Sequence, residues 1–365
     1  MVHAALVATL EPEVKPLNDV SLPARLVWLL AVLAVYIGAF LSGATRWIIG
    51  TQNQDSLVMA KLSETRLDLK FEDSYTVMAF IYAHTTELQR TIIEILVGVI
   101  FITYFMSSIR TNRILSLATF FILSPILFFL MLFTKETMLV PFIISAAMVL
   151  RKSWPTAMRV FLVLAIYTIY AFIFRKYYLM IGGSFLAIVA MRRASILIII
   201  AVCLAAVAVL IVMPSHVFES LQAARDVANI DRIGRDLPGM RTAFSNLVPP
   251  DSALNFVMNY AYAAAKLNFP ILSGFNIRDV YMSVNMLMVM WVLAVGFRAR
   301  RTDAWESSAL FLSHVLVYIC FEPDVGSYLR HVSVAMPYLV PALIVLDRRR
   351  SARNVTRGAY DLALP

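Results

Sequence analysis

Residues 194–213 read ASILIIIAVCLAAVAVLIVM and contain no charged side chain. An α-helix rises about 1.5 Å per residue, so roughly twenty apolar residues are enough to cross the ~30 Å hydrocarbon core of a bilayer. A soluble protein would have to bury such a helix on every side. The stretch therefore predicts a helix that crosses a membrane.

Nine other stretches are similarly apolar, with Glu94 in 91–109 as their one acidic residue, although several are shorter than the usual ~20 residues. The ten predicted spans are 26–44, 91–109, 114–133, 137–150, 160–174, 177–191, 194–213, 281–297, 307–321 and 332–346. The composition agrees, because 60% of the residues are hydrophobic and 15% are charged, whereas soluble domains carry about 25% charged residues. We expect an all-α fold: a polytopic transmembrane helical bundle in which residues 1–365 form a single integral membrane domain.

Six sets of lysine and arginine residues occupy gaps that the span count places on one side of the membrane. Basic residues mark cytoplasmic loops, so both termini should be cytoplasmic, and the net charge of +9 needs no nucleic-acid partner. Counting 252–270 as an eleventh span would put 298–301 outside, so we interpret 252–270 as a re-entrant or surface helix. The sets are Lys15 and Arg25; Arg110 and Arg113; Arg151, Lys152 and Arg159; Arg192 and Arg193; Arg298, Arg300 and Arg301; and Arg348, Arg349, Arg350, Arg353 and Arg357.

Two long segments, 45–90 and 214–280, then face outward, while 347–365 forms a cytoplasmic tail. Each outer segment is predicted to contain an amphipathic helix, which could lie in the interfacial plane or cap a cavity. The apolar stripe of the first helix is Phe71, Tyr75, Met78, Tyr82 and Thr85. The stripe of the second is Val217, Leu221, Ala224 and Ala228, with Glu219, Arg225 and Asp226 off it.

The gap Thr134-Lys135-Glu136 is the first candidate for a site, because it places a cation and an anion between two uncharged spans. Ionisable groups near membrane depth are costly and usually belong to a pathway or a site. Lys135 and Glu136 are therefore candidate site residues. The alternative is a simple polar turn between two hairpin helices.

The outer run 321–331, FEPDVGSYLRH, is the second candidate. Its carboxylates Glu322 and Asp324 stand near Arg330 and His331 in a turn. A guanidinium can hold two phosphate or carboxylate oxygens at once, and a carboxylate or histidine near neutrality can act as a general base. The alternative is a loop that anchors the chain at the interface.

Further outer charges follow the first span and lie between the fifth and sixth spans. Arg46, Asp55 and Glu72 follow the first span, where a carboxylate could polarise a sugar hydroxyl that attacks a lipid-linked donor. Arg175 and Lys176 carry positive charge on the outer side, which needs an anionic partner. Lipid pyrophosphate and ordinary phospholipid head groups would both serve.

Several kinds of chemistry lack support in the sequence. It contains no P-loop, dinucleotide fingerprint, HExxH or GxSxG motif, so nucleotide-driven chemistry and serine hydrolysis are not indicated, and no metal or cofactor is expected. His314 lies inside a predicted span. It is either a packed, hydrogen-bonded residue or the catalytic histidine of a membrane O-acyltransferase.

Two runs resemble a known family. Arg46, Gly50-Thr51 and Asp55, followed by 71–78 (FEDSYTVM), resemble the N-terminal part of the EpsG-like, Wzy-type exopolysaccharide and O-antigen polymerases. In these proteins an arginine, a Gly-Thr-Asp-like turn and a Glu-x-x-Tyr motif follow the first helix. The run 326–330 (GSYLR) before the last span is similar to the family's final Arg-Tyr-type segment.

The chain also departs from the family pattern. Gln52 stands where the family has an aspartate after Gly-Thr. The family's Ser-x-x-x-Arg-Gln-type feature is absent, and 134–136 stands roughly in its place. These departures leave the assignment of the catalytic carboxylate open.

The resemblance implies a metal-independent glycosyltransferase of the type C class in the bacterial inner membrane. It would join repeat units carried on undecaprenyl pyrophosphate at the periplasmic face, with membrane lipids, a chain-length regulator and a flippase as partners. A lipid-linked oligosaccharide flippase or other transporter is an alternative, although no internal repeat is seen; a membrane O-acyltransferase is another. With the outer charges, the resemblance assigns Asp55, Glu72 and Glu136 as catalytic residues, and Arg46, Lys135, Arg175, Arg330 and His331 as pyrophosphate- or sugar-binding residues.

Overall fold

The computed structural model describes residues 22–42, 61–64, 74–192, 194–234, 244–272 and 274–348. Within these ranges every regular element is a helix and no β-strand occurs. Five described helices are long and apolar enough to cross a membrane, and up to seven spans result if two bent helix pairs each count as one. The chain is therefore a multi-pass membrane protein. The five helices are α2 (Leu22–Leu41), α6 (Glu87–Met106), α9 (Thr156–Ile173), α14 (Ile277–Phe297) and α15 (Thr302–Phe321).

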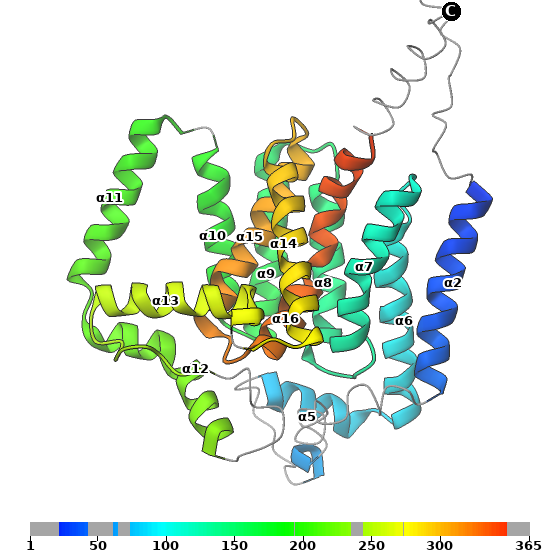
Figure 1. Ribbon diagram of the computed structural model, residues 1–365, viewed down its shortest axis with the longest axis horizontal. Helices are drawn as coiled ribbons and strands as arrows, with labels where there is room; N and C mark the ends of the chain where they lie inside the picture. Colours follow the sequence, from blue (N-terminus) through cyan, green and yellow to red (C-terminus); the bar gives the residue numbers. More distant parts are fainter. Residues whose placement is uncertain are drawn as a thin grey trace, which may run out of the picture.

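Each of the ten predicted spans coincides with helical residues, but not all of these helices have the length of a span. The others are α7 (Asn112–Phe128), α8 (Lys135–Leu150), α10 (Tyr178–Met191), α11 (Ile196–Val212) and α16 (Val325–Val334) with the helical residues after it. Figure 1 shows these helices side by side, running alternately up and down. The number of ten crossings stays a prediction.

The last predicted span, 332–346, is helical but broken by a bend. α16 begins at Val325, and the chain bends by 56° before it continues as Met336–Arg348. Pro337 lies at the start of the second piece, in the 3₁₀-helix η3 (Met336–Leu339). A proline has no N–H and clashes with the preceding turn, so a straight helix cannot run through this position without losing a hydrogen bond. Pro214 marks the other break, a 97° bend between α11 and α12 (Ser215–Gly234).

Two helices begin inside segments that the sequence places between spans. Thr86 and Gln89 form a reciprocal capping box, so α6 begins at Glu87, within 45–90. Asn276 caps α14 through the N–H of Asp279, within 214–280. Asp347, the first residue of the predicted tail, is buried in the bundle.

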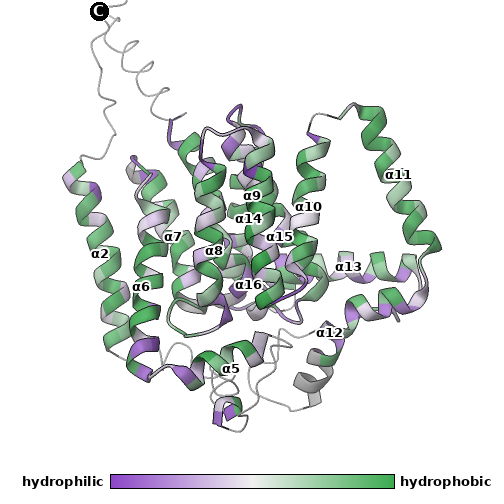
Figure 2. Cartoon of the chain, turned by 180° about the vertical axis from the view of Figure 1, so that it is seen from behind, coloured by the Kyte–Doolittle hydropathy of each residue, from purple (hydrophilic) through white to green (hydrophobic). Residues whose placement is uncertain are grey.

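Three helices lie across one end of the bundle: α5 (Ser74–His84), α12 and α13 (Ala253–Asn268) (Figures 1 and 2). The predicted stripe of α5 faces the bundle, since Met78 packs against Phe133 and the Tyr82 hydroxyl donates to the Phe133 carbonyl at 2.8 Å. α13 corresponds to the segment 252–270. It crosses the upright helices instead of running beside them.

The orientation predicted for α12 was wrong by about one residue along the helix. Arg225, expected off the packed stripe, is fully buried together with Phe218 and Gln222. Hydrogen bonds explain why polar groups face inward here: Arg225 donates to Asn246, and Asn229 donates to the Phe244 carbonyl at 2.7 Å. An apolar stripe read from sequence cannot anticipate a polar face whose partners come from a distant loop.

The two ends of the bundle differ in what they carry (Figure 1). One end holds the α6–α7, α8–α9, α10–α11 and α14–α15 turns and both ends of the described chain. The described members of the six basic sets belong to these segments, so we call this end the basic end. The opposite end holds the α7–α8, α9–α10 and α15–α16 turns and the three crosswise helices. We call it the site end.

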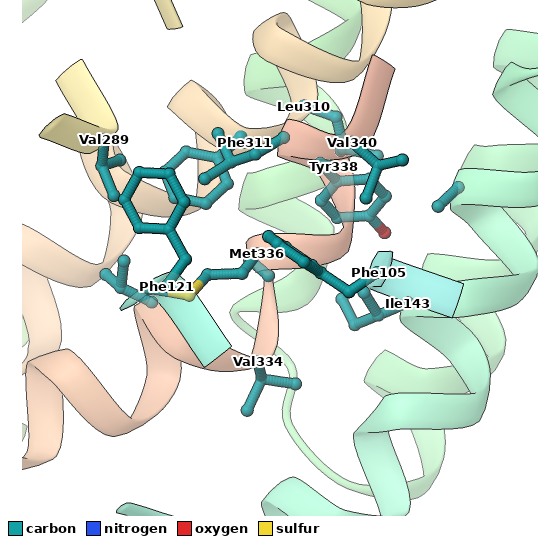
Figure 3. Close-up of a cluster of buried hydrophobic side chains, with 14 of the residues drawn as sticks. Phe105, Phe121, Ile143, Val289, Leu310, Phe311, Val334, Met336, Tyr338 and Val340 are labelled. Carbon is teal, nitrogen blue, oxygen red and sulfur yellow. The ribbon is translucent and has the colours of Figure 1, made fainter. Parts of the chain in front are cut away.

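The final segment of the chain forms the centre of the bundle. Met336, Tyr338 and Val340 are buried among side chains of α6, α7, α8, α14 and α15 (Figure 3). In contrast, α11 has no buried residue. Close packing, more than the hydrophobic effect, holds helices together in lipid, so the last segment is the rigid support of the site end.

Candidate functional site

Five ionisable side chains from three turns meet at the site end. Glu136 lies in the first turn of α8, Arg175 in the α9–α10 turn, Glu322 after the last residue of α15, and Arg330 and His331 on α16. We call these five residues the charge cluster. Segments separated by about 200 residues thus build one site.

Local sequence sets where the two key helices begin. The Asp324 carboxylate accepts the N–H of Ser327 at 2.9 Å, which starts α16 and places Arg330 and His331 in its second turn. At α8 the N–H of Thr134 donates to the hydroxyl of Thr137 at 3.3 Å. Glu136 therefore lies in a first helical turn, where the helix dipole favours a carboxylate.

Three basic groups converge on a single oxygen of Glu136. Its Oε1 is 2.8 Å from Nε2 of His331, 3.6 Å from Nε of Arg330 and 3.8 Å from Nη2 of Arg175. The residue is 1% exposed, and neither of its oxygens has a hydrogen bond: Oε1 has the three ionic contacts, and Oε2 is buried without a hydrogen-bond partner. A buried carboxylate oxygen without a partner is costly and is typical of a functional group.

The second carboxylate, Glu322, is fully engaged. Its Oε1 is 2.8 Å from Nδ1 of His331, and its Oε2 accepts the hydroxyl of Ser327 at 2.5 Å. Burial alone would raise the pKa of this carboxyl, but the charge and hydrogen bond of His331, with contributions from Arg175 and Ser327, lower that pKa to about 2. Glu322 is therefore an anion at any working pH.

Aromatic rings surround the basic groups. Arg175 donates to Nε2 of His331 at 2.6 Å and to the hydroxyl of Tyr177. The Lys135 ammonium, on a residue that is 3% exposed, lies 4.1 Å from the ring centroid of Tyr75. Such rings hold cations by their negative faces, so aromatic contacts help to position both basic side chains.

The structure brings together four of the site residues predicted from sequence, namely Glu136, Arg175, Arg330 and His331. Lys135 is their neighbour in sequence and is likewise buried, which does not fit a solvated polar turn. Glu322 belongs to the second candidate run, 321–331, but the sequence did not assign it as a catalytic or binding residue. The predicted residues Arg46, Asp55 and Glu72 lie outside the described residues.

Two partners in the cluster were missed by sequence reasoning. Ser327 holds Glu322, and Tyr177 holds Arg175. Serine and tyrosine are common near helix ends, so their presence there does not indicate which side chains they contact. The sequence carries no signal for Ser327, but the position of Tyr177 two residues after an unexplained arginine was a usable hint.

His314 belongs to a separate buried chain of hydrogen bonds. Its Nε2 contacts the Tyr167 hydroxyl at 2.5 Å, and its Nδ1 contacts the Tyr318 hydroxyl at 2.8 Å. Tyr338 and Tyr178 extend the chain at its two ends, at 2.8 and 2.9 Å. Both ring nitrogens are therefore engaged by the protein, as expected for a packed histidine and not for the base of an acyltransferase.

Comparison with known proteins found no matching family model, no matching curated protein and no matching solved structure. Among the described residues no group of three or more histidine, cysteine, aspartate or glutamate side chains could hold a metal ion. The function is therefore argued from the geometry and chemistry of the charge cluster. The cluster combines three basic side chains with a buried carboxylate whose Oε2 has no hydrogen-bond partner.

Proposed function

We propose that this chain is a polysaccharide polymerase that joins repeat units carried on undecaprenyl pyrophosphate. The observation that carries the proposal is the arrangement around Glu136: three basic groups face its Oε1, while its buried Oε2 has no hydrogen-bond partner. A lipid-linked sugar donor needs both parts of this arrangement. Its pyrophosphate needs cations, and the attacking hydroxyl needs a base.

The basic residues of the cluster would bind the donor through its pyrophosphate. Arg175 and Arg330 are permanently charged and present planar forks that match phosphate oxygens. Negative charge grows on the pyrophosphate as it leaves, and fixed cations in a buried site stabilise that charge more than water does. Lys135 adds a further cation beside Glu136.

Glu136 would act on the acceptor sugar. Its Oε2 takes the proton of the attacking hydroxyl, a new bond forms between that oxygen and the anomeric carbon of the donor, and the bond from the anomeric carbon to the phosphate oxygen breaks. General bases of this kind contribute about 10²–10⁴-fold to the rate. No residue needs to form a covalent bond to the sugar in this scheme.

We further propose that the site end faces the periplasm and the basic end faces the cytoplasm. The support is the positive-inside rule applied to the basic end. Reporter fusions after Lys135 and after Val325 should then give an external signal. A cytoplasmic signal from both would reverse the proposed orientation.

Feeding purified full-length protein a lipid-linked repeat unit in detergent tests the activity. Chain growth supports the polymerase, and loss of growth in Glu136→Gln assigns the base. Glu219→Gln is the matched control, because Glu219 is an exposed carboxylate on α12. Unchanged substrate with well-folded wild-type protein would refute the proposal.

A flippase for the same lipid-linked oligosaccharide is the second candidate. It is favoured by a buried ion pair at the basic end, opposite the charge cluster, where Arg159 and Glu306 tie α9 to α15 at 2.8 Å. Transporters commonly close at each end in turn. Movement of the lipid-linked unit across a reconstituted vesicle without chain growth would select this function.

A further inference from the structure

Nε2 of His331 lies between two groups with which it cannot form hydrogen bonds at the same time. It is 2.6 Å from Nη1 of Arg175 and 2.8 Å from Oε1 of Glu136. A guanidinium only donates hydrogen bonds and a carboxylate only accepts them. Neutral at Nε2, the ring accepts from Arg175; protonated at Nε2, it donates to Glu136. The two hydrogen bonds therefore exclude each other.

Glu322 determines that the exchange takes place at Nε2. Nδ1 of His331 is 2.8 Å from Oε1 of Glu322, and Ser327 holds the other oxygen of that carboxylate. A carboxylate this close to Nδ1 favours the proton on that nitrogen in both forms of the ring. A carboxylate behind a histidine fixes its tautomer in this way in many enzymes and metal sites.

The charges around His331 oppose one another. Its titratable and charged neighbours are Glu136 from α8, Arg175 from the α9–α10 turn, Tyr318 and Glu322 from α15 and its C-terminal end, and Arg330 on α16, with His314 farther inside the bundle. The two carboxylates favour the protonated ring, and the two guanidiniums favour the neutral ring.

We propose that Glu322 and His331 are a positioning pair, and that protonation of His331 at Nε2 moves its hydrogen bond from Arg175 to Glu136 and so releases Arg175 to bind pyrophosphate. The inference rests on the proposed function for the identity of the anion. In the neutral form Arg175 is held and Oε1 of Glu136 has no hydrogen bond from the ring. In the protonated form Arg175 is released and Oε1 of Glu136 is held, while Oε2 stays open to the acceptor hydroxyl in both forms. Protonation of the ring thus controls the arginine and orients the carboxylate.

Binding of inorganic pyrophosphate to the purified full-length protein tests this exchange without any turnover. Titration calorimetry between pH 5.5 and 8 would compare wild type with His331→Gln, and the ratio of their affinities cancels the titration of the probe itself. The ratio of the wild-type affinity for pyrophosphate to that of His331→Gln should grow by about tenfold as the pH falls, which corresponds to one charge-assisted hydrogen bond. A ratio that does not change with pH would overturn the proposal.

Arg175→Gln separates release of the arginine from simple attraction by a charged histidine. If protonation acts by releasing Arg175, this variant binds weakly and loses the pH response. A pH response that persists in Arg175→Gln would show that the imidazolium attracts the anion directly, against the proposal. Glu219→Gln should behave like wild type throughout.

A second variant protects the test against misfolding. If His331→Gln does not fold, Glu322→Gln takes its place, because losing the anion at Nδ1 should move the pH response to lower pH. An unmoved response in that variant would also overturn the proposal. Chain growth is a separate measurement: its absence beside an intact pH response would refute the polymerase alone, and the reverse result would refute the positioning pair alone.

Discussion

The two ends of the bundle use buried charge in opposite ways. At the basic end the buried carboxylates have short hydrogen bonds to their own partners: Oε1 of Glu306 accepts from Arg159 at 2.8 Å and from Thr156 at 3.0 Å, and Asp347 accepts the N–H groups of Arg110 and Thr111. The second oxygen of Glu306 has no hydrogen bond, as is also true of Glu136, so the difference lies in the basic groups. One arginine faces Glu306, whereas three basic groups face Oε1 of Glu136. The first pattern fixes two helices, and the second gathers basic groups that can also face an anionic ligand.

This contrast separates residues that hold the fold from residues that act on a substrate. A buried ion pair loses several kcal/mol when one partner is removed, because the other charge stays buried alone. In the charge cluster, Glu136 keeps two basic neighbours after the loss of any one. Substitutions at the basic end should therefore act on stability, and substitutions at the site end should act on activity.

Glu136→Gln should have the largest effect on activity. The amide keeps the size and polarity of the side chain but cannot take a proton, so chain growth should fall by about 10²–10⁴-fold. Polymer length is measured with the lipid-linked unit at equal protein levels in the membrane fraction. Growth within a few-fold of wild type would show that Glu136 is not the base.

Arg159→Met should have the largest effect on stability. It leaves Glu306 buried without its ion-pair partner, at a cost of roughly 3–5 kcal/mol. Thermal unfolding in detergent measures the loss, and Arg159→Met combined with Glu306→Leu should recover most of it. Arg330→Met at the site end is the comparison and should lower the melting temperature much less. An equal drop in both single variants would erase the distinction between the two ends.

Arg330→Lys should reduce chain growth by a smaller but clear factor. The ammonium keeps the charge and loses the planar fork, and one lost charge-assisted hydrogen bond is worth about 1.5–3 kcal/mol, or roughly 10- to 150-fold in rate. Arg300→Lys, an exposed arginine at the basic end, is the matched control. Wild-type growth in Arg330→Lys would exclude bidentate contact with the pyrophosphate.

Glu322 should give the smallest of these effects, visible as a pH dependence of stability. The pKa of Glu322 is lowered from 4.5 to about 2 in the folded protein. A lowered pKa stabilises the fold fully above the unfolded value, and this contribution is lost as the pH falls from about 4.5 toward 2. Melting temperatures of wild type and Glu322→Gln should therefore converge across that window. Parallel curves would contradict the assignment.

Much of the charge cluster was accessible from sequence because topology alone places residues on a side. Counting spans and basic gaps put 134–136, Arg175 and 321–331 on one face, and the structure brings these segments into contact at the site end. Span counting needs only composition averaged over many residues. It therefore tolerates errors of several residues at each helix end.

The features that sequence reasoning missed depend on single contacts between distant segments. The break before Pro337 was visible as a proline inside an apolar run, but hydropathy averages over it. The buried position of Arg225 depends on Asn246 in a loop about twenty residues away. The proposed exchange at His331 depends on two contacts of Nε2, at 2.6 and 2.8 Å, with residues of two other segments, which no pattern of residue types contains.

One measurement tests the central claim most directly: a structure of the full-length protein with a lipid-linked donor and acceptor bound. The account predicts the pyrophosphate between Arg175 and Arg330, with the acceptor hydroxyl within hydrogen-bond distance of Oε2 of Glu136. A donor bound at the basic end, or at the site end without contact to these two arginines, would contradict it.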